Sequence, residues 1–109
     1  MDIDLMSNII KLENELHFQK ILKENNRVLL SISEEWCSPC RAMEGTLVNT
    51  AFELEGKALV VKATVAVLPD LVKKLSIRTI PAYIIYKQGE VVEILYGIQP
   101  IKALTTFFC

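Results

Sequence analysis

Glycine and proline are scarce in this sequence of 109 residues: there are four of each, and each one stands alone. We find no internal repeat, linker or low-complexity tract, so the chain is predicted to form one domain over residues 1–109. An excess of one charge is also missing, because 12 Lys and Arg residues face 13 Asp and Glu residues. A nucleic-acid binder that neutralises phosphates is therefore not expected, since it needs a basic excess. A hydrophobic content of 51% excludes a disordered tail.

Long apolar stretches are absent as well. The longest apolar run, residues 80–86, has seven residues and contains Pro81, whereas a helix that spans a bilayer needs roughly 20. The chain begins with Asp2 and Asp4 where a secretory signal carries Lys or Arg, and no long apolar segment follows. We therefore expect a cytoplasmic protein that has no contact with a membrane.

Cysteine is the third scarce residue, with Cys37, Cys40 and Cys109 only. This odd number is too small for the disulfide framework that is typical of small secreted domains. A domain of this size buries roughly two-thirds of the surface of its unfolded chain, so it needs no covalent cross-link. The cysteines are therefore candidates for chemistry.

Hydrophobic spacing predicts strands and helices that alternate along the chain. The predicted strands are residues 9–12, 28–32, 58–65, 82–86 and 91–96. The predicted helices run from Asn14 to Asn25, from Cys37 to Gly56, over residues 68–75, and behind Pro100 to Phe108. The early β-α-β order predicts parallel strands, and Gln88-Gly89 predicts an antiparallel hairpin. The predicted fold class is α/β, with a mixed sheet of four to five strands and helices on both faces.

The segment Trp36-Cys37-Ser38-Pro39-Cys40-Arg41 lies where a predicted strand ends and a predicted helix begins. Cys37 is therefore expected at a helix N-terminus, where free N–H groups and the helix dipole favour an anion. Such a position lowers the pKa of a thiol from about 8.5, and the thiolate is the attacking species. Cys40 follows one turn later, where it can resolve a mixed disulfide. Pro39 fits the first helical turn without loss of a hydrogen bond.

Two other interpretations of the cysteine pair stay open at this point. A zinc or iron–sulfur site needs four ligands, and the chain offers only His17 and Cys109 in addition to the pair. A metal that bridges two chains would take Cys37 and Cys40 from each of them. Alternatively, the two thiols are inert core residues, because free cysteine is often buried.

Several separately placed features resemble the thioredoxin family, and the resemblance extends from Ile9 to Phe108. Residues 36–41 resemble the family motif Trp-Cys-Gly-Pro-Cys-Lys. The other matching features are Lys62, the cis-proline segment Ile77-Arg78-Thr79-Ile80-Pro81-Ala82, the last hairpin Tyr86-Lys87-Gln88-Gly89-Glu90, and Gly97. A Cys-x-x-Cys alone is a weak signal, whereas this combination is specific.

The resemblance implies a thioredoxin fold in which the Ile80–Pro81 peptide bond is cis and faces Cys37. A substrate peptide would then pair with the backbone of Ile80 as an added strand. The implied substrate-binding residues are Thr79, Ile80, Pro81, Gly97 and Ile98, and the implied supports of the active site are Trp36, Ser38, Pro39 and Lys62.

The sequence departs from the family pattern at two positions that concern Cys40 and the long helix. Six residues before Cys37 the family usually has a buried Asp that moves a proton to or from the second cysteine, but here the residue is Ser31. Serine cannot act as a base near neutral pH, so the usual route for deprotonating Cys40 is missing. A helix-kinking proline of the family is replaced by Gly45, which still permits a bend.

Charged residues near the pair raise two further questions. Glu34 and Glu35 precede Trp36, and they raise the pKa of Cys37 if they face the site but matter little if they are solvated. Lys62 either points toward the cysteines and stabilises the thiolate, which is our hypothesis, or extends its ammonium group into solvent.

These observations together predict a thiol–disulfide oxidoreductase that reduces or exchanges protein disulfides. Cys37 attacks the substrate disulfide, and Cys40 then releases the reduced substrate. No bound cofactor is expected, because the two sulfur atoms carry the electrons. The resemblance implies protein disulfides as substrates, recycling by a thioredoxin reductase, and a monomer. The alternative from another class is a binding module that holds a partner beside Pro81 without redox chemistry.

Overall fold

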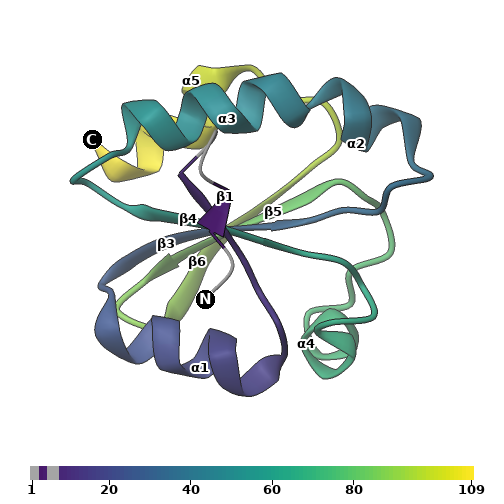
Figure 1. Cartoon of the computed structure of the whole chain (residues 1–109), viewed down its shortest axis with the longest axis horizontal. Helices are drawn as coiled ribbons and strands as arrows, with labels where there is room; N and C mark the ends of the chain where they lie inside the picture. Colours follow the sequence, from purple (N-terminus) through teal and green to yellow (C-terminus); the bar gives the residue numbers. More distant parts are fainter. Residues whose placement is uncertain (1–2, 5–7) are drawn as a thin grey trace.

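The predicted strands lie side by side in one sheet of the computed structural model, which describes residues 3–4 and 8–109 (Figure 1). The strands are β1 (Ile3–Asp4), β2 (Ile9–Lys11), β3 (Arg27–Ile32), β4 (Leu59–Ala63), β5 (Ala82–Lys87) and β6 (Glu90–Tyr96). Their order in the sheet is β1-β2-β4-β3-β5-β6. The strands β2 to β6 confirm the prediction of a mixed sheet, and the two-residue β1 is an addition that the sequence pattern did not indicate.

The pairing of the strands follows the order of elements along the chain. β2, β4 and β3 run parallel because helices connect them, whereas β5 and β6 are antiparallel neighbours. Gln88 and Gly89 join β5 to β6 with positive φ angles of 53° and 79°. The predicted hairpin is therefore confirmed, and its two successive positive φ angles identify the turn as type I′.

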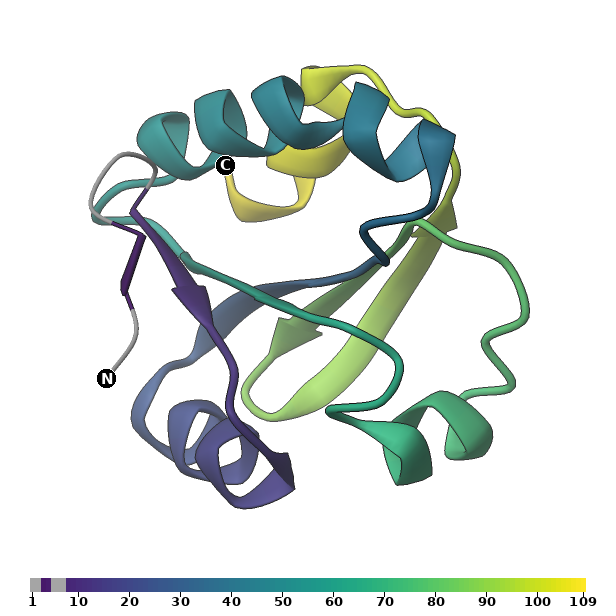
Figure 2. The same ribbon diagram turned by 45° about the vertical axis from the view of Figure 1, so that its right-hand side comes forward.

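Helices cover both faces of the sheet, as Figures 1 and 2 show. The helices are α1 (Glu15–Glu24), α2 (Ser38–Ala42), α3 (Glu44–Glu53), α4 (Pro69–Lys74) and α5 (Ile101–Thr105), and a 3-10 turn, η1 (Thr106–Phe108), follows α5. α1 and α4 lie on one face, and α2, α3 and α5 lie on the other (Figure 1). None of the helices in residues 3–4 and 8–109 has both the length and the apolar character needed to cross a membrane.

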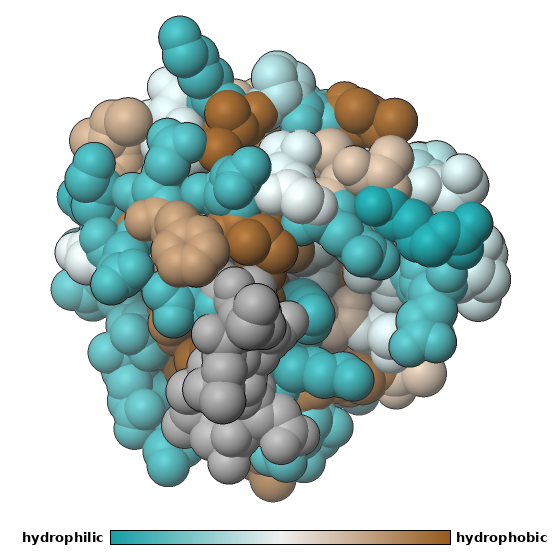
Figure 3. Space-filling model, turned by 45° about the horizontal axis from the view of Figure 1, so that its top comes forward, coloured by the Kyte–Doolittle hydropathy of each residue, from teal (hydrophilic) through white to brown (hydrophobic). Residues whose placement is uncertain are grey.

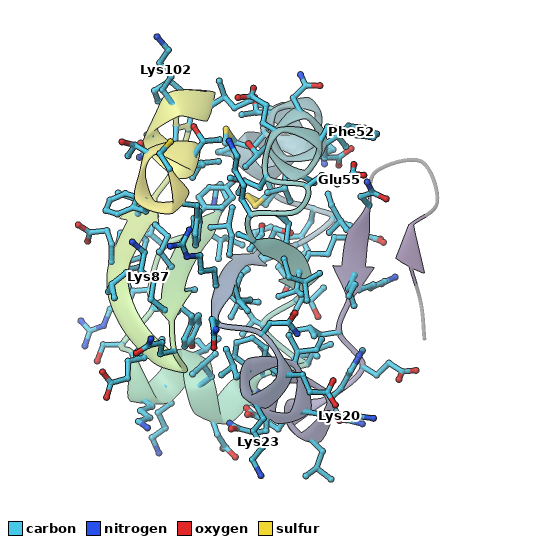
Figure 4. The ribbon with its side chains drawn as sticks, turned by 90° about the vertical axis from the view of Figure 1, so that its left-hand side faces the viewer. Lys20, Lys23, Phe52, Glu55, Lys87 and Lys102 are labelled. Atoms are coloured by element: carbon cyan, nitrogen blue, oxygen red, sulfur yellow. A yellow bond between two sulfur atoms is a disulfide. The ribbon has the colours of Figure 1, made fainter. Side chains whose placement is uncertain are left out.

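The first helix illustrates how the sequence fixes a local structure. The Oδ1 atom of Asn14 accepts a hydrogen bond of 2.8 Å from the backbone N–H of His17, which caps the N-terminus of α1. Phe18 and Ile21 are buried on the side of α1 that faces the sheet. Lys20 and Lys23 project away from the sheet, as Figure 4 shows, so the polar side of the helix meets solvent.

Alternate residues of β3 belong to two separate hydrophobic clusters. Val28, Leu30 and Ile32 pack with residues of α1 and α4, whereas Leu29 packs with residues of α3 and α5. Successive side chains of a strand point to opposite faces, so Ser31 shares the face of Leu29. Ser31 therefore points to the face of the sheet that α2, the helix that contains Cys40, covers together with α3 and α5.

The prediction of one long helix from Cys37 to Gly56 is wrong in one respect, because the structure shows two helices, α2 and α3, that meet at Met43. The backbone N–H of Met43 donates to the carbonyl oxygens of Pro39 at 3.2 Å and Cys40 at 3.1 Å, which ends α2. α3 then begins at Glu44. The interruption comes two residues before Gly45, so the glycine lies inside the first turn of α3 and is not the point of bending. The buried side chain of Met43 anchors the junction against the core.

Tyr86 on β5 carries a buried hydroxyl group that lacks a partner. Its side chain is 3% exposed and packs edge to face on Phe18, with ring centroids 5.3 Å apart. Burial raises the pKa of Tyr86, and the carboxylate of Glu15 raises it further, so the hydroxyl stays protonated. Within the described part of the chain, no group makes a hydrogen bond with this Oη atom.

We expect the substitution Tyr86→Phe to raise the free energy of unfolding by about 1 kcal/mol, because it removes an unsatisfied buried polar atom and keeps the ring. Urea unfolding of the variant and the wild type measures the difference. Tyr96→Phe is the matched control, since Tyr96 is exposed and its hydroxyl already meets solvent. A loss of stability in Tyr86→Phe would contradict the prediction.

Candidate active site

The two cysteines of the motif form a disulfide at the N-terminus of α2. The Cα atoms of Cys37 and Cys40 are 5.2 Å apart, and their sulfur atoms are bonded. Cys37 is the N-cap residue of α2, and the backbone N–H of Cys40 donates to Cys37 Sγ at 3.2 Å. Pro39 lies within the first turn, as predicted. The expected junction between the buried strand and the helix is therefore confirmed.

This geometry favours a negative charge on Cys37 once the disulfide is reduced. The N–H of Cys40 points at the sulfur, and the first turn of the helix adds further donors and the positive end of its dipole. A thiolate in such a position is a stronger nucleophile at neutral pH than an ordinary thiol, because its pKa is lowered. Both cysteine residues are nearly buried in the disulfide form, with 5% of Cys37 and 6% of Cys40 exposed.

The loop from β3 to α2 is held in place by backbone contacts. The carbonyl oxygen of Glu34 accepts a hydrogen bond of 3.3 Å from the N–H of Cys37. The guanidinium group of Arg41 donates to the carbonyl oxygen of Glu35 at 2.8 Å. Trp36, which precedes the pair, is 74% exposed. The loop thus fixes the backbone of the motif and leaves the indole free to contact another molecule.

The chain on the other side of Cys37 comes from the segment before β5. The Ile80–Pro81 bond is cis, as the resemblance implied. Cys37 Sγ lies 3.8 Å from the carbonyl oxygen of Ile80. Gly97, at the end of β6, donates its N–H to the carbonyl oxygen of Pro81 at 2.8 Å. The structure therefore brings the predicted residues Ile80, Pro81 and Gly97 together beside the disulfide.

Two other predicted substrate-binding residues lie at the surface. Ile98 follows Gly97 and is 67% exposed, which is unusual for an isoleucine. Thr79 is exposed and directly precedes Ile80. Their contact with a substrate stays a prediction, as does the supporting role of Ser38, which is exposed at the start of α2.

A cavity of about 500 Å³ lies beneath the disulfide, between the sheet and the helices α2 and α3. The residues that line it include Cys40 of α2, Ser31 of β3 and Lys62 of β4. Ser31 is paired with Lys62 on β4 and with Tyr83 on β5 in the register of the sheet. Lys62 and Cys40 thus border the same space, and the stabilisation of a thiolate by Lys62 stays a prediction.

Two contacts at this site could not be predicted from the sequence pattern. The Glu34 carboxylate turns back into the fold, and its Oε2 atom accepts a hydrogen bond of 3.0 Å from the backbone N–H of Val65. Glu35, by contrast, is exposed. In addition, the N–H of Gln99 donates to Met43 Sδ at 3.4 Å, which ties the loop after β6 to the junction of α2 and α3. Both contacts join segments that lie far apart in the chain.

The two residues considered as additional metal ligands lie away from the cysteine pair. His17 is on α1, on the opposite face of the sheet from α2. Cys109 is a free, exposed thiol at the C-terminus, which Figure 1 shows at the far end of α3 from α2. Across residues 3–4 and 8–109, no group of three His, Cys, Asp or Glu side chains is placed to hold a metal ion.

Comparisons with known proteins agree with this geometry. The family model "Thioredoxin" matches residues 8–108. The chain belongs to the thioredoxin family. Thioredoxin C-2 of Corynebacterium nephridii is 32% identical over 103 residues, which cover 94% of this chain and 95% of that protein. A thioredoxin of Buchnera aphidicola subsp. Baizongia pistaciae is 36% identical over 84 residues, with 77% of each chain covered. Mitochondrial thioredoxin 3 from Saccharomyces cerevisiae, in its oxidized form, has a TM-score of 0.81 at 25% identity and 92% coverage of both chains.

The protein is therefore a thiol–disulfide oxidoreductase of the thioredoxin family, as predicted. Its redox centre is the Cys37–Cys40 pair, which the structure shows in the disulfide form. We expect that, in the dithiol form, the Cys37 thiolate attacks a substrate disulfide and that Cys40 then attacks Cys37 to release the substrate. In this direction of exchange, two electrons pass from the pair to the substrate, and the Cys37–Cys40 disulfide is the product.

We expect Cys40→Ser to accumulate a mixed disulfide between Cys37 and a protein substrate, because the resolving thiol is missing. Mass spectrometry under non-reducing conditions detects the adduct. Cys37→Ser is the matched control and should form no adduct, because it lacks the thiol at the N-terminus of α2 that makes the attack. Equal adduct formation in both variants would contradict the assignment of Cys37 as the nucleophile.

A second prediction concerns Lys62. We expect Lys62→Met to raise the pKa of the Cys37 thiol, because the substitution removes a positive charge that borders the same cavity as the pair. The pH dependence of alkylation of the reduced protein measures this value. Lys62→Arg should preserve the wild-type profile, and Lys102→Met removes a charge that projects away from the fold (Figure 4). An unchanged profile in Lys62→Met would mean that the ammonium group does not stabilise the Cys37 thiolate.

Proposed function

We propose that this protein reduces disulfides in other proteins and that a thioredoxin reductase returns it to the dithiol form. The observation that carries the proposal is the position of Cys37, at the N-terminus of α2 and 3.8 Å from the Ile80 carbonyl oxygen. A thiolate in that position is the species that attacks a substrate disulfide, so the dithiol form can begin the reduction at neutral pH.

The surface around Cys37 supports extended protein segments as the substrates. The side chains of Trp36, which precedes Cys37, and of Ile98, which follows Gly97, are exposed and offer apolar contacts to a substrate. The backbone of Ile80 offers hydrogen-bonding groups to a chain that lies across the site as an added strand. Main-chain contacts of this kind depend little on the substrate sequence, which suits a protein that acts on many disulfides.

The proposal also includes a cytoplasmic location and a monomeric state. A reductant is useful where reductases keep thiols reduced, and the cytoplasm is such a compartment. The face in Figure 3 carries mostly hydrophilic side chains, with apolar residues in separate spots. A surface of this kind does not require a second copy of the chain to cover it.

The direction of electron flow is tested by the redox equilibrium of the Cys37–Cys40 pair in defined thiol–disulfide buffers. We expect a two-electron transition near about −270 mV, which is typical of cytosolic reductants. Fluorescence of Trp36 follows the transition, because the indole directly precedes the pair. A potential of about −180 to −120 mV would instead identify an oxidant or isomerase and would overturn the reducing direction.

A companion assay separates reduction from simple binding. With NADPH and a thioredoxin reductase, the wild-type protein should reduce a disulfide-containing protein in many turnovers. The variant with both Cys37→Ser and Cys40→Ser should lose this activity and keep its fold. A biological activity that survives in the double variant would support the binding module rather than the reductant.

A further inference from the structure

The resolving step requires a proton acceptor that this chain does not have at the usual place. Cys40 must lose its thiol proton before it can attack the mixed disulfide on Cys37. Cys40 is 6% exposed, so bulk water has little access to the sulfur from outside. Ser31 lies beneath it with a hydroxyl group, which cannot accept a proton near neutral pH. The acceptor must therefore be another group that the cavity connects to Cys40.

The cavity beneath Cys40 is large and polar enough to admit water. Its volume of about 500 Å³ is many times that of one water molecule, and Ser31 and Ser33 supply hydroxyl groups to its wall. The charged residues that border it are Lys11 of β2, Lys62 of β4, Glu34 and Glu35 of the loop after β3, and Glu44 of α3. The three carboxylates are the groups that can take up a proton from a thiol.

Glu34 differs from the other two carboxylates in how it is held. Its side chain is half-buried and its Oε2 atom accepts the N–H of Val65, which leaves Oε1 available for water in the cavity. Its backbone oxygen accepts the N–H of Cys37, so the residue is also fixed to the redox motif. Glu35 and Glu44 have exposed side chains. A fixed carboxylate transfers protons more effectively than a mobile one, since the geometry is already set.

We propose that Glu34 accepts the proton of Cys40, through water in the cavity, during the resolving step. The Cys40 thiolate then forms a bond with Cys37 Sγ, the bond between Cys37 and the substrate sulfur breaks, and the substrate leaves as a thiolate. Glu34 returns its proton to solvent or to the departing thiolate, so protons and electrons balance. The reverse reaction uses the same path. The proposal therefore deepens the established exchange chemistry and does not rest on the direction of electron flow.

Glu34→Gln is the decisive variant, because glutamine keeps an oxygen that can accept the Val65 N–H but cannot take up a proton. We expect the resolving step to slow by about 100-fold at pH 7, which is within the range for loss of a general base. The rate should recover as the pH approaches about 8.5, where a thiol ionises without help. Rapid mixing of the reduced protein with a small aromatic disulfide, whose release is followed by absorbance, resolves the two steps.

The controls separate a proton-transfer role from a structural one. In a Cys40→Ser background, Glu34→Gln should leave the first step, the attack by Cys37, unchanged. Glu35→Gln and Glu44→Gln remove the neighbouring carboxylates and should retain the wild-type resolving rate and pH profile. A wild-type pH profile in Glu34→Gln would overturn the proposal, and so would a slowed resolving step in Glu44→Gln alone.

A measurement on the wild-type protein keeps the proposal testable if Glu34→Gln fails to fold. The carboxyl carbon resonance of Glu34, observed by NMR at pH 7, should differ between the dithiol and disulfide forms, because water in the cavity connects the carboxylate to the Cys40 thiol. An identical resonance in the two forms would overturn the proposal. Neither experiment uses a reductase, so a negative result leaves the proposed reducing function untouched.

Discussion

The attachment of α2 to the end of β3 is the constraint on which the rest of the site depends. β3 is paired on both sides, with β4 and β5, so its end has a fixed position in the sheet. Five residues after the strand ends, Cys37 caps α2 and receives the N–H of Cys40. The same placement sets Cys37 Sγ beside the carbonyl oxygen of Ile80. The nucleophile, its activating donor and its substrate-facing backbone are therefore positioned by one strand.

The register of that strand also determines the chemistry beneath the disulfide. Ser31 points to the side of α2 and α3, where it meets Lys62 of β4 and Tyr83 of β5 as lateral neighbours. A carboxylate is absent at this position of the sheet, yet Glu34 supplies one to the same cavity from the following loop. The negative charge near Cys40 thus comes from the loop after β3 and not from a strand of the sheet. The hydrogen bond from the backbone N–H of Val65 holds this carboxylate in place.

The sequence predicted the elements well wherever local spacing decides the structure. The hairpin at Gln88-Gly89 follows from turn preferences, and the start of α1 follows from the capping residue Asn14. The cis bond before Pro81 became predictable only through the family resemblance. The interruption at Met43 was missed, because it depends on how a buried side chain packs in three dimensions. The orientation of Glu34 was left open for the same reason, because its partner Val65 is 31 residues away.

The separation of the two hydrophobic clusters has a practical consequence for engineering. Val28, Leu30 and Ile32 pack toward α1 and α4. Leu12, Ala63 and Val67 of the same cluster also line the cavity, and Ile80, which packs against this cluster, lies beside Cys37. A chimera that takes α1, α4 and the apolar face beneath them from a relative can therefore acquire a different thermal tolerance and keep the surroundings of the sulfur pair, provided that these four side chains are retained.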